Sequence, residues 1–240
     1  MQGLAIASII LAVASSEIPV PGTWHDTLAA EKFEKGSDSL VVSAVGDSIT
    51  YGSCSSDPSS RAYPPQMADM VNNASRTIYN FGVSGATMMK TGDLPYWEQD
   101  AYAMALQSSP DIVVIMLGTN DAKTYQWDQD QFVTDYLAMI ESFASLASSP
   151  KIYLNIPPPL YADGIYSMNQ TIINEVFPLL VPAIAEESGV EGVIDIFSAL
   201  GGADLTDYQF FCDGQNCDQC HPNDAGYVVL GATVYKTLFM

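Results

Sequence analysis

Basic residues are scarce in this chain. Its 240 residues include 8 Lys and Arg against 28 Asp and Glu, which gives a formal net charge of -20 at pH 7. A field of that sign repels phosphate backbones and anionic lipid, so nucleic acids and membrane surfaces are poor candidate partners. Charged residues make up 15% of the chain and hydrophobic residues 48%, a balance typical of one globular domain rather than of a disordered segment.

Long hydrophobic runs are also missing. The apolar stretch at residues 4–14 is too short to span a bilayer, and no later stretch comes closer to that length. It ends with Ala12 and Ala14 in an A-x-A arrangement, which predicts a secretory signal peptide at residues 1–16, a single domain at 17–240 and a secreted protein. The alternative is a buried N-terminal strand or helix, because no Lys or Arg precedes the stretch.

Cysteine is limited to four positions, which are Cys54, Cys212, Cys217 and Cys220. An even count in an exported chain predicts up to two disulfides, in three possible pairings that the sequence does not separate. The alternative is a metal site, since Cys217 and Cys220 form a C-x-x-C; no second such pair or histidine pair completes it, so no metal is predicted. Asn73 and Asn169 begin glycosylation sequons, which matter only in a eukaryotic secretory route.

Short apolar runs of mostly β-branched residues alternate with segments of helical pattern. The predicted strands are residues 40–45, 77–81, 112–117, 152–156 and 192–196, and the predicted helices are residues 63–72, 98–107, 129–146, 167–187 and 225–238. Continuous rather than alternating apolarity indicates strands covered on both faces. The alternation requires parallel pairing with right-handed crossovers, so we expect an α/β fold with three layers, a parallel sheet between helices. Ligands then bind beyond the carboxyl ends of the strands.

Four segments near those strand ends carry candidate catalytic groups. They read GDSIT from Gly46, NFGVSG from Asn80, GTND from Gly118 and, before the last helix, DQCHPN from Asp218. A serine nucleophile needs a base, a group that orients the base, and donors for the oxyanion. The candidate catalytic residues are Ser48 as nucleophile, His221 as base and Asp218 as orienting acid. The candidate oxyanion donors are the N–H groups of Ser48 and Gly85 and the side-chain amide of Asn120.

Each of these residues also has an ordinary structural interpretation. Ser48 alone is more typical of a helix cap, Gly85 of a turn, and Asn120 of a turn or cap. His221 could simply open the last helix, and Asp213 competes with Asp218 as the orienting carboxylate. The ordinary interpretations do not explain why the candidates follow successive strands of one sheet, where an active site is expected.

The four segments, in this order, resemble the sequence blocks of the GDSL or SGNH hydrolases. The resemblance runs from Val41 to the final helix. It implies a flavodoxin-like sheet of five parallel strands, hydrolysis of acyl esters without metal or cofactor, and the roles given above. The stretches NFGVSGATMMKTGDLPYW and IMLGTNDAKTYQW further resemble carbohydrate esterases of the sialate O-acetylesterase type. This second resemblance implies an O-acetylated sugar as substrate, with Tyr96, Trp97 and Trp127 as candidate stacking residues; plain packing is the alternative.

One departure from the family pattern is the group of cysteines around the histidine. Cys220 directly precedes His221, and Cys217 directly precedes Asp218. A disulfide there would brace this loop, and Cys54 could connect the nucleophile segment to it.

The sequence therefore predicts a secreted serine esterase that removes short acyl groups, most of all acetate, from carbohydrates through an acyl-enzyme. Two alternatives stay open. One is a lysophospholipase or thioesterase that uses the same site, with residues 157–165 as part of the pocket wall. The other is a non-catalytic carbohydrate-binding module on a hydrolase-like fold.

Overall fold

A computed structural model describes residues 39–205, 209–211 and 218–240 of the chain. Several residues named above lie outside the described residues, namely the predicted signal peptide, Cys212, Asp213 and Cys217. In the part that is described, no helix is both long and apolar enough to cross a membrane.

Five strands form one sheet in which every neighbouring pair is parallel. They are β1 (Leu40–Gly46), β2 (Arg76–Gly82), β3 (Ile112–Met116), β4 (Lys151–Ile156) and β5 (Gly192–Asp195). Their order is β2-β1-β3-β4-β5, the flavodoxin-like order whose direction reverses between β1 and β3. The predicted fold class is confirmed. The switch point places the ends of β2, β1 and β3 side by side, where the three predicted site segments begin.

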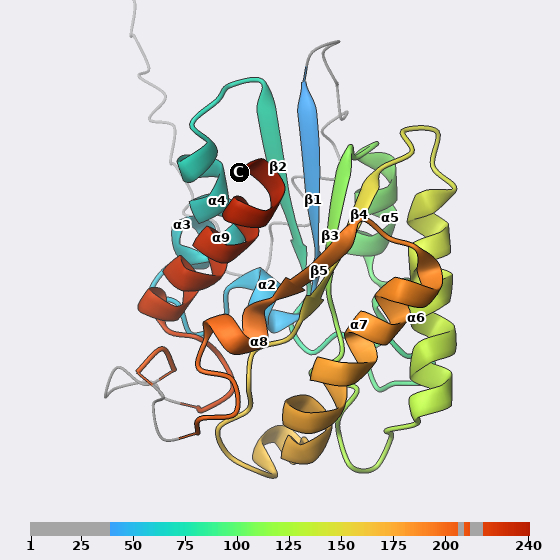
Figure 1. The fold of residues 1–240 in the computed structure, drawn as a ribbon, viewed down its shortest axis with the longest axis vertical. Coiled ribbons are helices and arrows are strands. Elements are labelled where there is room, and N and C mark those ends of the chain that lie inside the picture. The colour runs from blue at the N-terminus through green and yellow to red at the C-terminus, as the bar shows by residue number, and fades with distance from the viewer. Residues whose placement is uncertain (1–38, 206–208, 212–217) are drawn as a thin grey trace, which may run out of the picture. The chain divides into compact units, whose positions relative to one another are not determined.

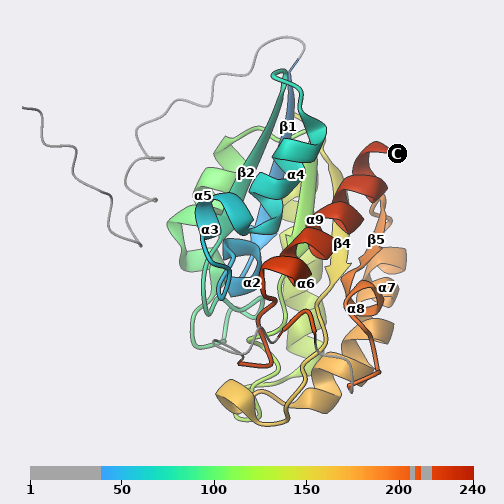
Figure 2. The same cartoon turned by 90° about the vertical axis from the view of Figure 1, so that its left-hand side faces the viewer.

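Helices cover both faces of the sheet (Figure 1). One face carries α3 (Pro58–Arg61), α4 (Tyr63–Val71) and α9 (Asp224–Phe239), and the other carries α5 (Asp100–Gln107), α6 (Gln129–Ala144) and α7 (Phe177–Ser188). Figure 2, turned by a quarter, shows the same two layers in front of and behind the strands. The central strands β1 and β3 are buried from both sides, which explains their continuous apolar runs, whereas the edge strands β2 and β5 are mostly only partly buried.

Shorter elements connect these layers at the ends of the strands. They are α2 (Ser48–Tyr51), α8 (Ile196–Ala199) and the short helical turns η1 (Tyr96–Glu98), η2 (Ile165–Ser167) and η3 (Ile172–Val176). The helix predicted at residues 167–187 is divided: η3 is a π-helical turn that leads into α7. Pro178 and Pro182 lie in the first two turns of α7 and have no N–H to donate to the regular backbone bonds. The apolar helical pattern continues through this stretch, so periodicity alone did not reveal the break.

Two glycines allow α2 to lie against the sheet. A Cβ atom on Gly82 would lie 2.1 Å from the nitrogen of Tyr51, and one on Gly46 would lie 2.1 Å from Oγ1 of Thr50. Side chains at the last positions of β1 and β2 would therefore push α2 away from the strand ends. The glycines fix the place where the chain presents Ser48.

Candidate active site

The short helix α2 lies directly beyond β1 (Figure 1). Ser48 is its first residue. The carboxylate of Asp47 caps this helix by accepting the N–H of Ile49 (2.9 Å). Gly52 ends the helix in the left-handed region at φ 104°, a conformation that glycine adopts readily. The first N–H groups of a helix have no acceptor within it, so the N–H of Ser48 is directed outward at the strand end.

His221 and Asp218 reach Ser48 from the loop before α9. The Nε2 atom of His221 lies 2.8 Å from Oγ of Ser48. Its Nδ1 atom lies 2.5 Å from Oδ2 of Asp218. The structure thus joins the three predicted residues in one chain of hydrogen bonds, across a sequence separation of 173 residues between Ser48 and His221.

Asp218 accepts more hydrogen bonds than that of His221 alone. Its Oδ1 accepts the N–H groups of Cys220 (2.9 Å) and His221 (2.8 Å). Its Oδ2 also accepts the thiol of Cys54 (3.3 Å) and the hydroxyl of Tyr166 (3.1 Å). Burial acts to raise the pKa of Asp218, but the hydrogen bonds and charge of His221 outweigh it and hold that pKa well below its usual range. Asp218 is therefore ionised, as a carboxylate that orients an imidazole must be.

The three predicted oxyanion donors follow neighbouring strands. Gly85 lies beyond β2 with φ 85°, in the left-handed region, and within the described residues its N–H has no protein acceptor. Asn120 lies beyond β3 and is 5% exposed. Its Nδ2 donates to the carbonyl of Ala86 (3.1 Å), which holds the amide next to the Gly85 segment. Because an amide nitrogen carries two hydrogens, one remains for a ligand.

Ser48, His221 and Asp218 form the proposed catalytic triad. Two buried carboxylates near it were not singled out from the sequence. Asp121 is fully buried and accepts the N–H groups of Met88 (2.9 Å) and Met89 (2.7 Å), so it ties the Asn120 loop to the Gly85 segment. Burial raises the pKa of Asp121 to about 7. Asp47, equally buried, has its pKa raised to about 6 for the same reason. Both directly adjoin a predicted site residue, which is the only signal that the sequence offered.

The candidate stacking residues are engaged with the protein itself. Tyr96 is fully buried and donates its hydroxyl to the carbonyl of Phe81 (2.7 Å), so its prediction as a sugar contact is wrong. Trp97 donates Nε1 to the carbonyl of Met88 (2.7 Å) and packs its ring under the ammonium group of Lys90. Trp127 has ring contacts with Phe132 at 5.2 Å and Phe177 at 5.6 Å between centroids. Packing is the interpretation that these contacts favour for all three aromatic residues.

The two described cysteines, Cys54 and Cys220, are not bonded to each other. Pairing that involves Cys212 or Cys217 stays a prediction. Cys54 also forms, with Asp218 and His221, a group whose ligand atoms lie within 4.8 Å of one another and could in principle hold a metal. The imidazole and carboxylate of that group already bind each other, so the geometry serves the hydrogen-bond chain to Ser48.

The buried Asp47 gives a prediction about stability. In the unfolded chain this carboxyl titrates near its ordinary pKa of 3.8, whereas in the folded chain its pKa is about 6. The folded state therefore binds the proton more tightly, and the contribution of Asp47 to stability falls as the pH rises from about 4 to about 6. Asp47→Asn keeps an oxygen for the Ile49 N–H and carries no charge. We expect it to be more stable than the parent at pH 8 by on the order of 2 kcal/mol, with the difference vanishing toward pH 4.

Urea unfolding at pH 4, 6 and 8 measures this difference. The matched control is Asp57→Asn at the exposed cap of α3, where hydrogen bonds from Ser60 and Ser59 lower the pKa of Asp57. That charge favours the folded state above pH 4, so the control gains no stability at pH 8. An Asp47→Asn protein less stable than the parent at pH 8 would contradict the expected burial penalty.

A doubly wound parallel sheet that brings a serine, a histidine and an aspartate together at its carboxyl edge has the arrangement of the serine-hydrolase class. Within that class, residues 44–229 match the GDSL-like Lipase/Acylhydrolase family, and the chain belongs to this family.

The chain is also similar to individual esterases. The chain is 30% identical over 223 residues to an acetylxylan esterase of Xylanibacter ruminicola, a match that covers 85% of this chain and 43% of the relative. The chain thus spans less than half of that relative's length. Among solved structures, an acetylxylan esterase from Geobacillus stearothermophilus is similar at a TM-score of 0.63 and 21% identity, covering 86% of this chain and 97% of that one. A two-domain esterase active on acetylated mannans is similar at a TM-score of 0.60 and 20% identity, covering 90% and 53%.

Proposed function

We propose that this chain is a secreted serine esterase that removes O-acetyl groups from a carbohydrate such as acetylated xylan. The observation that carries the proposal is the continuous hydrogen-bond chain from Ser48 through His221 to Asp218 at the switch point of the sheet. Family membership and the resemblance to an acetylxylan esterase support the choice of ester and alcohol. Export by way of the predicted signal peptide fits a polymeric substrate, which does not enter cells.

In this mechanism Nε2 of His221 takes the proton of Ser48 while Oγ attacks the acetyl carbonyl. The oxyanion that forms accepts hydrogen bonds from the N–H groups of Ser48 and Gly85 and from the amide of Asn120. His221 then returns the proton to the departing sugar oxygen, which leaves an acetyl group on Ser48. A water molecule, activated by His221 in the same way, releases acetate and restores the serine. Asp218, ionised throughout, stabilises the imidazolium.

The surroundings of Ser48 suit a polar alcohol better than a long acyl chain. Several side chains that lie toward solvent near the proposed site are polar: Ser53 and Ser84 approach each other at 3.3 Å, and Cys54 and Tyr166 lie at Asp218. A long acyl chain requires an extended apolar lining. The net charge of -20 does not repel a neutral sugar and favours the departure of acetate, an anion.

A panel of esters tests the proposal. Acetate release is measured from acetylated xylo-oligosaccharides and from p-nitrophenyl acetate, and p-nitrophenol release is measured from the butyrate, octanoate and palmitate esters. We expect kcat/KM to fall by about tenfold or more between acetate and octanoate, because methylene groups that find no complementary pocket are not bound. Acetylated xylo-oligosaccharides should be deacetylated catalytically, with repeated release of acetate by each enzyme molecule.

Two outcomes would contradict this substrate assignment. Higher kcat/KM for octanoate or palmitate would favour a lipid acyl hydrolase of the lysophospholipase or thioesterase kind. Binding of xylo-oligosaccharides without hydrolysis of any ester would favour a non-catalytic carbohydrate-binding module.

A further inference from the structure

A segment beyond β4 connects the two loops that carry the proposed base and the proposed oxyanion amide. We call residues 160–169 the bridging segment. Near one end, the N–H of Tyr161 donates to the carbonyl of Gln219 in the loop of the base (3.0 Å). Near the other end, the carbonyl of Ser167 accepts the N–H of Thr124, which follows the oxyanion loop (3.0 Å). The path of the bridging segment is therefore tied to both halves of the site.

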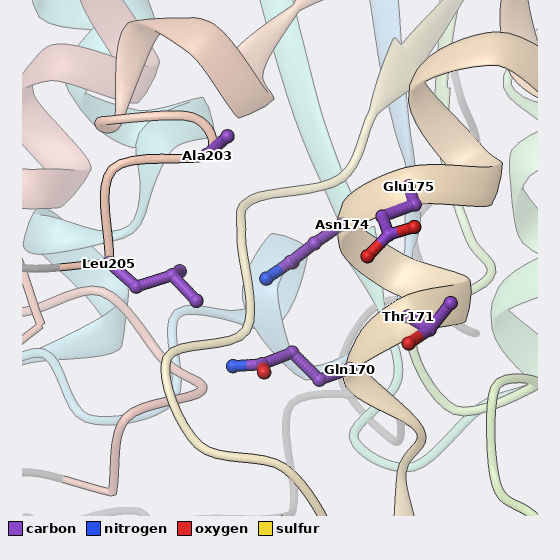
Figure 3. A pocket seen from close by; sticks show the side chains of 6 residues that line it. All are labelled: Gln170, Thr171, Asn174, Glu175, Ala203 and Leu205. Atoms are coloured by element: carbon purple, nitrogen blue, oxygen red, sulfur yellow. The ribbon is translucent and has the colours of Figure 1, made fainter.

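Side chains from the start of the following helix anchor the bridging segment. The Leu160 carbonyl accepts Nε2 of Gln170 (2.8 Å) and Nδ2 of Asn174 (2.9 Å), and Oδ1 of Asn174 accepts the Leu160 N–H (2.8 Å). Figure 3 shows both amides pointing from this helix toward the neighbouring loop. They also line a pocket of about 130 Å³, together with Thr171, Glu175, Ala203 and Leu205. No proposed catalytic residue lines it.

Tyr166 lies within the bridging segment in an unusual backbone conformation. Its φ is 51° and that of Ser167 is 66°, so two successive non-glycine residues occupy the left-handed region. Such residues are rare there, and they persist where the surrounding contacts hold them. Here the holding contacts are the N–H of Ser167 to the carbonyl of Gly164 (3.0 Å) and the Thr124 bond described above. The tight turn directs the side chain of Tyr166 to the triad.

The side chain of Tyr166 touches both partners of the proposed acid–base pair. Its hydroxyl donates to Oδ2 of Asp218 (3.1 Å), the oxygen that faces Nδ1 of His221. Its ring meets the imidazole of His221 edge to face, with centroids 6.0 Å apart and planes at 60°. Partial burial and the charge of Asp218 raise the pKa of Tyr166 to about 12, so the hydroxyl stays protonated and remains a donor.

Despite these contacts, Tyr166 is 53% exposed. An aromatic ring that is fixed at one edge and open to solvent on the rest of its surface can receive the apolar face of a sugar. The imidazole that it contacts is the group that would protonate the departing sugar oxygen, so a ring in this place lies beside the leaving group.

We infer that Tyr166 is a positioning residue for the Asp218–His221 pair and that its exposed ring surface binds the sugar from which acetate is removed. This inference rests on the proposed esterase function. The hydroxyl and the ring have separate tasks, so two substitutions separate them: Tyr166→Phe removes the donor and keeps the ring, and Tyr166→Ala removes both.

Acetate release is measured from acetylated xylotriose and from ethyl acetate, whose alcohol is too small to reach the ring. We expect Tyr166→Phe to lower kcat about threefold to tenfold on both esters, because a hydrogen bond to a charged group is lost, while KM is retained. Tyr166→Ala should show the same loss of kcat and, for xylotriose alone, a KM raised about threefold to tenfold. The controls are Tyr125→Phe and Tyr125→Ala. Tyr125 is 65% exposed and donates to Asp93 rather than to the triad, so these variants should match the parent.

A second measurement does not depend on turnover. The proton between Nδ1 of His221 and Asp218 is expected far downfield in the proton NMR spectrum. The chain has two histidines, so a His25→Gln variant assigns it. Tyr166→Phe should shift this resonance, since one donor to the shared oxygen is gone, and Tyr125→Phe should not.

The outcomes are distinct. An unchanged resonance and an unchanged kcat in Tyr166→Phe would overturn the positioning role. A KM for acetylated xylotriose that is unchanged in Tyr166→Ala would overturn the sugar contact. Failure of the parent protein to release acetate from either ester would overturn the proposed function and the sugar contact with it, while the resonance would still decide whether Tyr166 positions the pair.

Discussion

Ser48→Ala should lower kcat/KM for acetyl esters by roughly 10⁵-fold or more, the scale on which loss of a serine nucleophile acts in serine hydrolases. Without Oγ no acyl-enzyme forms, and His221 has no proton to take from the protein. The oxyanion donors remain and can still polarise a bound ester, so a small residual rate is expected. Ser48 is 9% exposed and its hydroxyl contacts His221, so the substitution leaves the core intact. The urea unfolding midpoint should stay close to that of the parent.

The test combines turnover with covalent labelling. A fluorophosphonate probe should label the parent protein once and should not label Ser48→Ala. Ser60→Ala in the exposed helix α3 is the matched control, because the side chain of Ser60 donates to Asp57 and to none of the proposed catalytic residues, so it should retain full activity and labelling. Turnover of Ser48→Ala at the parent rate would show that Ser48 is not the nucleophile.

The strands of the sheet could be predicted closely because their own composition indicates β-structure. Each of the five predicted strands lies within one residue of the observed bounds at either end. Runs such as IVVIM in β3 are β-branched, apolar and buried on both faces, so composition and environment agree. The parallel pairing followed from the alternation of strands and helices. The flavodoxin-like arrangement of the strands was implied by the family resemblance, not by these rules.

The helices after β4 were harder to predict. The stretch from Ser167 to Glu187 keeps an apolar helical pattern, yet the chain forms η2, then η3, then α7. Pro178 and Pro182 remove backbone donors there, and a tertiary contact acts on the same stretch: Gln170 and Asn174 hold the carbonyl of Leu160. Contacts of this kind depend on the path of a loop and leave no periodic trace in the sequence.

The same distinction, between features marked by the local sequence and features set by tertiary contacts, applies to the site. Ser48, Asp218 and His221 could be proposed because each lies in a short motif next to a strand or helix end. Tyr166 belongs to no motif and reaches Asp218 across 52 residues of sequence, one residue beyond the segment predicted to form the pocket wall. Tyr96 failed as a sugar contact because aromatic residues near a site motif serve the core as readily as a ligand, and burial decides between them.

Asp218→Asn should lower kcat by roughly 10³- to 10⁴-fold, with little change in KM. From described residues, Asp218 accepts five hydrogen bonds, three of them on Oδ2. An amide nitrogen in place of one oxygen is a donor, so it faces donors on whichever side it occupies. If it faces His221, the imidazole presents the wrong tautomer to Ser48; if it faces the backbone, the loop before α9 loses its N–H acceptor.

Two further aspartates make the result specific. Asp224→Asn, in the first turn of α9, changes a carboxylate that accepts the N–H and hydroxyl of Ser56, so its kcat should stay within about twofold of the parent. Asp213→Asn tests the competing orienting carboxylate and should likewise be nearly neutral. If Asp213→Asn showed the large loss and Asp218→Asn did not, the base would be oriented by the other residue. The five donors gathered on Asp218 would then serve the loop rather than the chemistry.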